Sequence, residues 1–404
     1  MYVYAGIDEA GYGPLFGPLL VGRMVLGIPH LSVDSPDTDI HEFTGPQLWN
    51  RLADAVCRDL TNRKGRIAVN DSKKLRKAKT TTAAKVSSTW KSDSDETAVC
   101  LDSLQGGAES LSSCDKTRSL CEAHLKSIEH LERGALAFSA QAGFRCANVS
   151  EWLDSLGENS HHKLDHLPWY AASEKRPWES LPRTCSEGEI AVARSLLSGS
   201  TRKAGVNVLD LGAAVAFEDR FNQMVSATRS KAAVSFTFVA GHLRSIWDRF
   251  GECHPRVVVD RQSGRTHYRE LLSMTFPEAD LTILDETPAI SSYRLEAKAP
   301  RAAQPKASIQ ETSNSNALTT TSRAITISFE VDSEQQHMPV ALASMVSKYT
   351  RELLMSRFQA WFLAHAPHIS PTAGYAADAK RFWKEIQPEL KRLSIDPSRL
   401  VRLA

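Results

Sequence analysis

The sequence predicts an α/β protein in which helices flank a mixed central β-sheet. Three apolar stretches, at residues 2–8, 255–260 and 325–332, have the β-branched and aromatic composition of buried strands, and each ends in a carboxylate. Stretches with the apolar spacing of amphipathic helices lie between and after them. Because a parallel or mixed sheet brings several strand ends to one edge, we expect a ligand site there.

The first predicted strand runs directly into two carboxylates and a glycine-rich turn. Asp8 and Glu9 end the apolar run, and Gly11, Tyr12 and Gly13 follow. Carboxylates at the end of a buried strand are costly to desolvate unless a cation or hydrogen-bond donors compensate them. Consecutive side chains of a strand point to opposite faces, so both acids can serve one site only if the strand bends or bulges. A strand followed by a polar turn is an equally good interpretation of this segment alone.

The next informative segment, from Asn70 to Leu75, has the order of a capped helix. Asp71 or Ser72 suits the N-cap position, and Leu75 begins an apolar face. Ser72 and Lys73 would then offer a hydroxyl, an ammonium and backbone amides to a phosphate at the start of a helix. Taken alone, an ordinary capped helix is the simpler interpretation.

Taken together, the segments resemble the ribonuclease HII family. The matching segments, in the order of the family, are Asp8-Glu9-Ala10-Gly11-Tyr12-Gly13-Pro14 with Gly17-Pro18, Asp71 to Leu75, the Val-Asp strand ending at Asp260, Tyr268 to Leu272 with Phe276-Pro277, Leu342 to Glu352, and Gly374-Tyr375. Any one of these motifs is weak, whereas the whole series in family order is difficult to explain by chance. The matches span nearly the whole chain and cover roughly half of its residues. Tyr12 replaces the arginine of the family's turn, and Glu352 replaces an aspartate.

The resemblance implies a ribonuclease-H-like mixed sheet with a helical C-terminal extension, and an endoribonuclease of RNA/DNA hybrids. Two-metal hydrolysis of the RNA strand would leave 5′-phosphate and 3′-hydroxyl ends. The resemblance assigns catalysis and metal binding to Asp8, Glu9, Asp260 and Asp332. Mg²⁺ or Mn²⁺ suits such a set because hard cations prefer oxygen ligands.

The fourth ligand is the least secure of these. Asp332 lies farther from the following helix than the family spacing, and Glu330 and Glu334 are neighbouring acids. Asp285, which follows another strand, is a further rival, but a turn residue is the better interpretation there.

The resemblance also suggests substrate contacts, which are Gly11, Tyr12, Gly13, Ser72, Lys73, Lys348 and Tyr375. The backbone of the glycine turn would contact the 2′-hydroxyl, which distinguishes RNA from DNA. The two lysines and Ser72 would contact phosphates, although basic residues near Lys348 also suit helix solubility. Tyr375 would stack on a sugar or base, and a tyrosine that caps the core is the competing interpretation.

Composition divides the chain into segments. We expect the catalytic core at 1–76, 206–296 and 324–404, with helices at the C-terminal end. Residues 77–205 are expected to form a partly helical and partly flexible insertion that the core can do without, and residues 297–323 a flexible loop. A chain of 404 residues suffices for one core with extra elements, or for two domains.

Charge and cysteine content limit the function classes. The net charge of +2 provides no global basic field, so a nucleic-acid surface would be local. No apolar run reaches membrane-spanning length, no cleavable signal precedes the first strand, and the seven cysteines include no Cys-x-x-Cys pair. We therefore expect a cytoplasmic monomer whose partner is an RNA/DNA hybrid duplex and not a membrane.

Two other function classes remain open on the sequence. A catalytically weak protein that only binds hybrids would fit the altered turn at Tyr12, and metal-dependent cleavage would exclude it. An actin-like or sugar-kinase-type phosphotransferase also begins with a strand, an acid and glycines, but the sequence shows no second phosphate loop. Affinity for ATP would identify that class.

Overall fold

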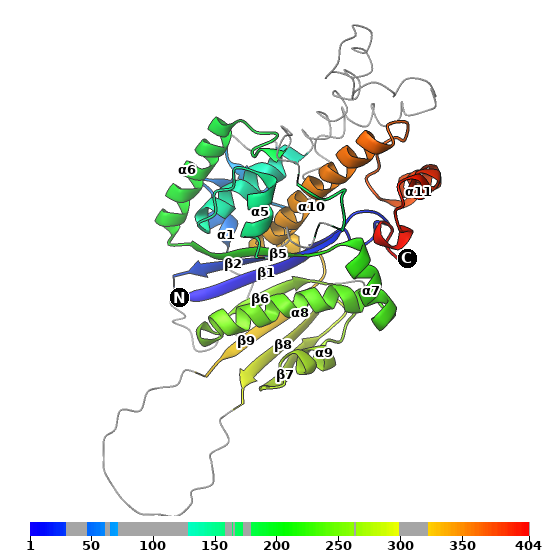
Figure 1. Cartoon of the computed structure of the whole chain (residues 1–404). Coiled ribbons are helices and arrows are strands. Elements are labelled where there is room, and N and C mark those ends of the chain that lie inside the picture. The colour runs from blue at the N-terminus through cyan, green and yellow to red at the C-terminus, as the bar shows by residue number, and fades with distance from the viewer. Residues whose placement is uncertain are drawn as a thin grey trace, which may run out of the picture.

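A seven-stranded mixed sheet forms the centre of the computed structural model, which describes residues 1–29, 47–60, 65–71, 128–157, 164, 166–172, 179–261, 264–298 and 322–403. The strand order is β5-β2-β1-β6-β9-β8-β7 (Figure 1). The strands are β1 (Tyr2–Ala10), β2 (Leu19–Ile28), β5 (Asn207–Ala216), β6 (Arg256–Asp260), β7 (Ala279–Glu286), β8 (Ile290–Ala297) and β9 (Ala324–Glu330). The β1–β6 and β6–β9 pairs are parallel and the other four pairs are antiparallel. The predicted mixed sheet with flanking helices is therefore present.

Helices cover both faces of this sheet (Figure 1). One face packs against α10 (Met338–His365), α5 (Val149–Ser155), α6 (Glu187–Ala204), the short α1 (Leu48–Arg51) and a helical stretch over 128–141. The other face packs against α7 (Glu218–Thr228), α8 (Lys231–Phe250) and α9 (Arg269–Thr275). Side chains of β1 alternate between the two cores, because Val3, Ala5 and Ile7 pack on the α8 side whereas Tyr4 packs on the α10 side.

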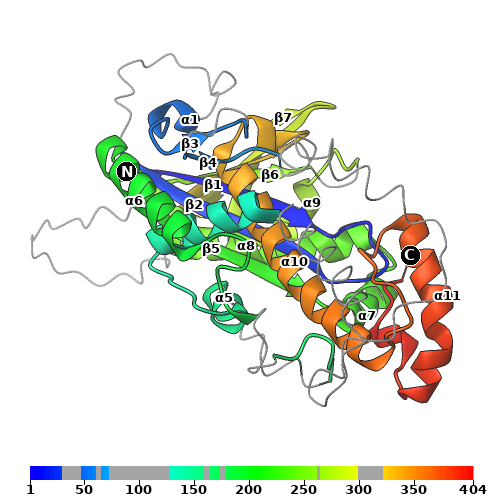
Figure 2. The ribbon, with the colours of Figure 1, turned by 90° about the horizontal axis from the view of Figure 1, so that it is seen from above.

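The remaining elements lie at the periphery. α11 (Ala376–Arg392) and the 3₁₀ turn η6 (Pro397–Arg399) lie near the end of α10 and near α7 (Figure 2). A two-stranded sheet pairs β3 (Val56–Cys57) with β4 (Ile67–Ala68), and the 3₁₀ turns η4 (Gly251–Cys253) and η5 (Ser333–Gln335) follow α8 and β9. Within the described part of the chain, no helix is long and apolar enough to cross a membrane.

The long helix α10 lies directly against the sheet. Most of its side chains are buried, and Pro339 stands in its first turn, where a missing N–H leaves no bond unmade. A Cβ on Gly6 of β1 would lie 2.2 Å from Pro339 C and Val340 N, so only glycine permits this approach. The start of α10 is thereby held against the strand that carries the first two acids.

The segment expected to be a dispensable insertion is part of the main core where the structure describes it. Leu131, Trp152 and Leu197 belong to the same buried cluster as Tyr4 and Met345 of the sheet and α10. The expectation of a segment that the core can do without is therefore not supported for 128–157 and 179–204. Residues 77–127 and the predicted loop at 299–321 lie outside the described residues.

A buried carboxylate ties this segment to α10. Glu132 is fully buried and accepts hydrogen bonds from the amides of Arg183, Thr184 and Cys185 at 2.6–2.9 Å. The hydroxyl groups of Thr184 and Tyr349 donate to it at 2.6 and 2.8 Å. Five donors compensate the desolvation of one charge, so the carboxylate joins three separate pieces of chain.

Glu132→Ala should therefore lower the free energy of unfolding by about 3 kcal/mol or more, because several buried donors lose their acceptor together. Glu187→Ala, at an exposed position of α6, is the control and should change stability by less than about 1 kcal/mol. Urea denaturation of both variants checks this. Equal stability of the two variants would show that the 128–204 region does not contribute to the core as described.

Candidate functional site

Two carboxylates face each other because of the register between parallel strands. The β1–β6 ladder ends with Ile7 opposite Val259, so the next residues in line are Asp8 and Asp260. Their alternation places both on the α10 side of the sheet, the side of Tyr4 and Val258. The Ser344 hydroxyl of α10 donates a hydrogen bond to the Asp8 carboxylate. The amide and hydroxyl of Ser333 donate to Asp260 Oδ1 at 3.2 and 2.8 Å.

These acids line a hollow of about 270 Å³ at the end of the sheet, which we call the acid-lined hollow. Its walls are Asp8, Glu9, Ala10, Gly11, Tyr12, Gly13, Asp260, Glu334, Ser344, Lys348, Arg351, Glu352 and Tyr375. It therefore combines carboxylates from strand ends, the glycine turn, one face of α10 and an exposed tyrosine.

Glu9 reaches the hollow without the strand bulge that the sequence suggested. The β1–β2 register runs unbroken through Asp8 and Glu9, so the two side chains start on opposite faces. Glu9 Oε2 accepts a 2.6 Å hydrogen bond from Ser235 on the α8 side. Pairing with β6 ends at Ile7, which leaves this end of β1 open on one side. Both acids border the hollow, although the carboxylate of Glu9 is bonded on the α8 side.

Glu334, rather than Asp332, joins the acid-lined hollow. Asp332 has a left-handed φ of 52°, precedes the η5 turn and is exposed. Glu334 lies within that turn and is buried, and it is the acid that hydrogen-bonds Asp260. Glu330 is engaged elsewhere, since it accepts a 2.8 Å hydrogen bond from the ring of His337. The expected position of Asp332 in the cluster is thus not the one observed.

Burial and mutual repulsion raise the pKa values of the clustered acids. Burial, with repulsion from Glu334 and Glu9, raises the pKa of Asp8 to about 7. Burial and then Asp8 raise the pKa of Asp260 to about 6. Burial, Asp260 and Asp71 raise the pKa of Glu334 to about 7. Ionising all of these carboxyls together is therefore unfavourable, because the hydrogen bonds they accept do not offset burial and mutual repulsion.

The donor chemistry of the hollow fits a hard divalent cation. The acids offer only oxygen ligands, and Glu334 Oε2 is buried without a hydrogen-bond partner. Across the described residues, no three Asp, Glu, His or Cys side chains are grouped closely enough to hold an ion as they stand. A cation would therefore have to draw the carboxyls together, which relieves the repulsion that raises their pKa values.

One face of α10 supplies the rest of the hollow. Ser344, Lys348, Arg351 and Glu352 recur every three or four residues, which aligns them on one side of a helix. Arg351 is 3% exposed, so solubility does not explain it. Of these four, only Lys348 was predicted to contact substrate, and the three- and four-residue spacing is the sequence signal that relates the other three to it.

Of the remaining predicted substrate contacts, Tyr375 is described and two residues are not. Tyr375 is 46% exposed, and the Arg351 guanidinium carbon lies 5.1 Å from its ring centroid. Ser72 and Lys73 lie outside the described residues. Asp71, the last described residue before them, is close enough to Glu334 to raise its pKa, so that motif begins beside the hollow.

Three buried charged side chains hold the turn that follows Gly13. Glu218 Oε1 accepts from the Gly17 amide at 2.8 Å, and Arg351 Nη2 donates to the carbonyl of Phe16 at 3.0 Å. The Arg402 guanidinium donates to the carbonyl of Pro14. Gly11 has φ of 83°, and its Cβ would lie 2.6 Å from the carbonyl oxygen of Pro18. The turn is thus fixed by backbone bonds from distant elements.

Comparisons with known proteins do not identify the function of this site. No family model matches the sequence, and no curated protein does. A ribonuclease HII from Archaeoglobus fulgidus, solved in complex with PCNA, superposes with a TM-score of 0.33 at 12% identity, over 99% of this chain and 94% of that chain. A superposition this loose carries no argument about function. The fold and site define an α/β protein with an acid-lined hollow at the end of a mixed sheet.

The clustered acids should make stability depend on pH and on divalent ions. Because folding raises the pKa of Asp8 to about 7, its contribution to stability is lost as pH rises from about 4 through 7. Asp8→Asn should therefore be more stable than the natural protein at pH 8 without divalent ions, by on the order of 1–3 kcal/mol. Mg²⁺ or Mn²⁺ should raise the melting temperature of the natural protein and much less that of the variant.

Thermal melts with and without each ion check this, with two further variants. Asp332→Asn should respond to the ions like the natural protein, whereas Glu334→Gln should lose the response. If Asp332→Asn lost the response to the ions and Glu334→Gln kept it, Asp332 would be the fourth ligand.

Proposed function

We propose that this protein is an endoribonuclease that hydrolyses the RNA strand of RNA/DNA hybrids with the help of Mg²⁺ or Mn²⁺. The observation that carries the proposal is the register of β1 and β6, which aligns Asp8 and Asp260 on one face. Glu9 and Glu334 border the same hollow. Together these four residues would hold the ions.

Each acid has a local support that orients it for this role. Ser344 donates to Asp8 from α10, and Ser333 donates twice to Asp260. Glu334 and Asp260 share a hydrogen bond, which requires a proton on one carboxyl group. Binding of a cation would release that proton, so affinity for the ion should rise with pH. When bound, the ions supply an activated water and neutralise charge at the phosphate.

The rest of the hollow suits a polynucleotide backbone. Lys348 lines it one helical turn beyond Ser344, where an ammonium can meet a phosphate. The glycine turn exposes backbone groups to the hollow, and backbone groups are able to recognise a 2′-hydroxyl. Tyr375 provides an exposed ring at the rim, suited to stacking on a sugar or base.

Cleavage assays on a fluorescent RNA/DNA hybrid test the proposal. Asp8→Asn, Asp260→Asn and Glu334→Gln should each reduce the cleavage rate by more than about 100-fold. Loss of a residue that only supports a metal ligand typically costs roughly 10–100-fold, and these three are proposed as ligands themselves. Asp332→Asn is the matched control, because it removes an exposed acid two residues from Glu334, and it should retain most activity.

Two results would contradict the proposal in different ways. Hybrid binding without cleavage in either ion would point instead to a protein that only binds hybrids. Full activity of Glu334→Gln with loss in Asp332→Asn would keep the nuclease but move its fourth ligand.

Tyr12 should weaken the preference for a single embedded ribonucleotide. A tyrosine at this position can stack or make one hydrogen bond but offers no cationic fork to the junction between RNA and DNA. Tyr12→Arg should therefore shift cleavage toward a duplex with one ribonucleotide, relative to a long RNA strand, while DNA stays uncut. The ratio of the two rates, measured for both proteins, is the test. A natural protein that already strongly favours the single ribonucleotide, with no change in the variant, would show that Tyr12 does not read the junction.

A further inference from the structure

Tyr375 follows a short segment, residues 372–374, that α10 and the glycine turn both contact. Gln359 and Arg351 of α10 donate to the carbonyls of Thr372 and Ala373 at 3.1 and 3.4 Å. Tyr375 is the N-cap residue of α11 and its side chain makes no capping hydrogen bond. The backbone of 372–374 therefore sets where its ring begins, and the Arg351 guanidinium lies 5.1 Å from the ring centroid. The carbonyl of Gly374 accepts a 2.8 Å hydrogen bond from the Leu15 amide, which joins this segment to the glycine turn. A Cβ on Gly374 would lie 2.4 Å from the carbonyl oxygen of Phe16, so no side chain can anchor the segment there.

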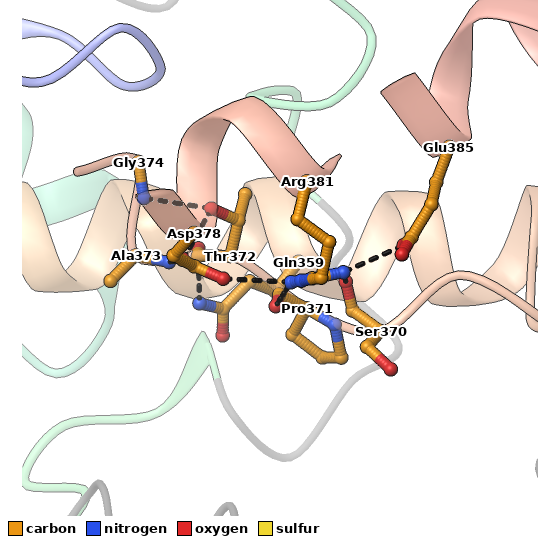
Figure 3. Close-up of polar contacts among 9 residues, drawn as sticks. All are labelled: Gln359, Ser370, Pro371, Thr372, Ala373, Gly374, Asp378, Arg381 and Glu385. Atoms are coloured by element: carbon orange, nitrogen blue, oxygen red, sulfur yellow. Dashed lines mark hydrogen bonds and ion pairs between the residues drawn. The ribbon is translucent and has the colours of Figure 1, made fainter. Parts of the chain in front are cut away.

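Asp378 anchors the amide side of this segment from the first turn of α11. Its Oδ2 accepts from the Thr372 hydroxyl at 2.7 Å and from the Ala373 amide at 2.9 Å. The same Thr372 hydroxyl oxygen accepts from the Gly374 amide at 2.9 Å. Figure 3 shows Asp378 lying between this segment and Arg381. One carboxylate thus organises the amides of the two residues that precede Tyr375.

Arg381 completes the arrangement from the next turn of the helix. It donates to the carbonyls of Ser370 and Pro371 at 3.2 and 2.8 Å, and to Asp378 Oδ1 at 2.8 Å. A second carboxylate, Glu385, accepts from Arg381 at 2.6 Å on the side away from the segment (Figure 3). The two acids therefore share one guanidinium, but only Asp378 touches the segment.

We propose that Asp378 is a positioning residue that holds the ring of Tyr375 at the rim of the acid-lined hollow and so sets the affinity for the hybrid. This inference rests on the proposed function. Asp378 does not line the hollow, so it acts through Tyr375 and not on the substrate. A carboxylate suits this place because the hydroxyl of Thr372 and the amide of Ala373 converge on one oxygen, and hydrogen bonds to a charged acceptor are the stronger ones.

A double-mutant cycle separates this role from general stability. Tyr375→Ala should raise KM for the hybrid about tenfold, as loss of one stacking contact does, with kcat changed by less than about twofold. Asp378→Ala should raise KM about threefold or more in the natural background. In the Tyr375→Ala background it should change KM by less than about twofold, because the ring that it positions is gone. Independent, multiplicative effects would overturn the proposal.

Glu385→Ala is the matched control, since it removes the other carboxylate on Arg381 and leaves the segment untouched. Its KM should stay within about twofold of the natural value. Thr372→Val removes the hydroxyl between Asp378 and the Gly374 amide, and should reproduce the effect of Asp378→Ala. An equal rise in KM for Glu385→Ala and Asp378→Ala would assign the effect to Arg381 or to α11 as a whole.

Hydrogen exchange provides a readout that needs no substrate. The amides of Ala373 and Gly374 should exchange at least about tenfold faster in Asp378→Ala than in Glu385→Ala. Unchanged exchange with normal cleavage would overturn the role of Asp378 alone. A natural protein that neither cleaves nor binds hybrids would overturn the proposed function, whereas the exchange rates would still show whether Asp378 holds the segment.

Discussion

The placement of carboxylates at the open end of two parallel strands is the constraint on which the rest of the site depends. Asp8 and Asp260 are brought together by ladder register alone, and no local motif near either residue is required. Desolvation then makes their surroundings strongly unfavourable to charge. Ser344 and Ser333 offset part of that penalty by donating to them. What remains uncompensated is a site that a cation would stabilise.

Around this centre, three buried charged side chains hold backbone segments in place. Glu132 accepts from the amides of a loop, Glu218 accepts from an amide of the glycine turn, and Arg402 donates to a carbonyl of the same turn. A charged group bonded to backbone fixes the loop through charge-assisted hydrogen bonds. Burial raises the pKa of Glu218 to about 7, so its charged form is costly to desolvate where it supports the turn. These buried hydrogen bonds therefore stabilise the backbone that shapes the hollow.

Much of the fold was accessible from the sequence because its signals are local. The strand ending at Asp260 and the helix after Pro339 follow from apolar composition and from a proline suited to a first helical turn. The exchange of Asp332 for Glu334 was not accessible, because it depends on a left-handed residue and one 3₁₀ turn. Asp332 and Glu334 are only two residues apart, and the backbone conformation between them decides which one is buried. Composition alone does not predict that conformation.

The segment around Arg402 packs on the glycine turn, so the hollow is completed late in folding. The amide of Arg402 donates to the carbonyl of Leu15 at 2.9 Å, so residues almost four hundred positions apart share one piece of backbone. Closing so long a loop is entropically slow and requires the chain up to residue 402 to have left the ribosome. A nascent chain can therefore form most of its sheet while its acidic strand end is still open, and the complete pocket exists only after synthesis has passed residue 402.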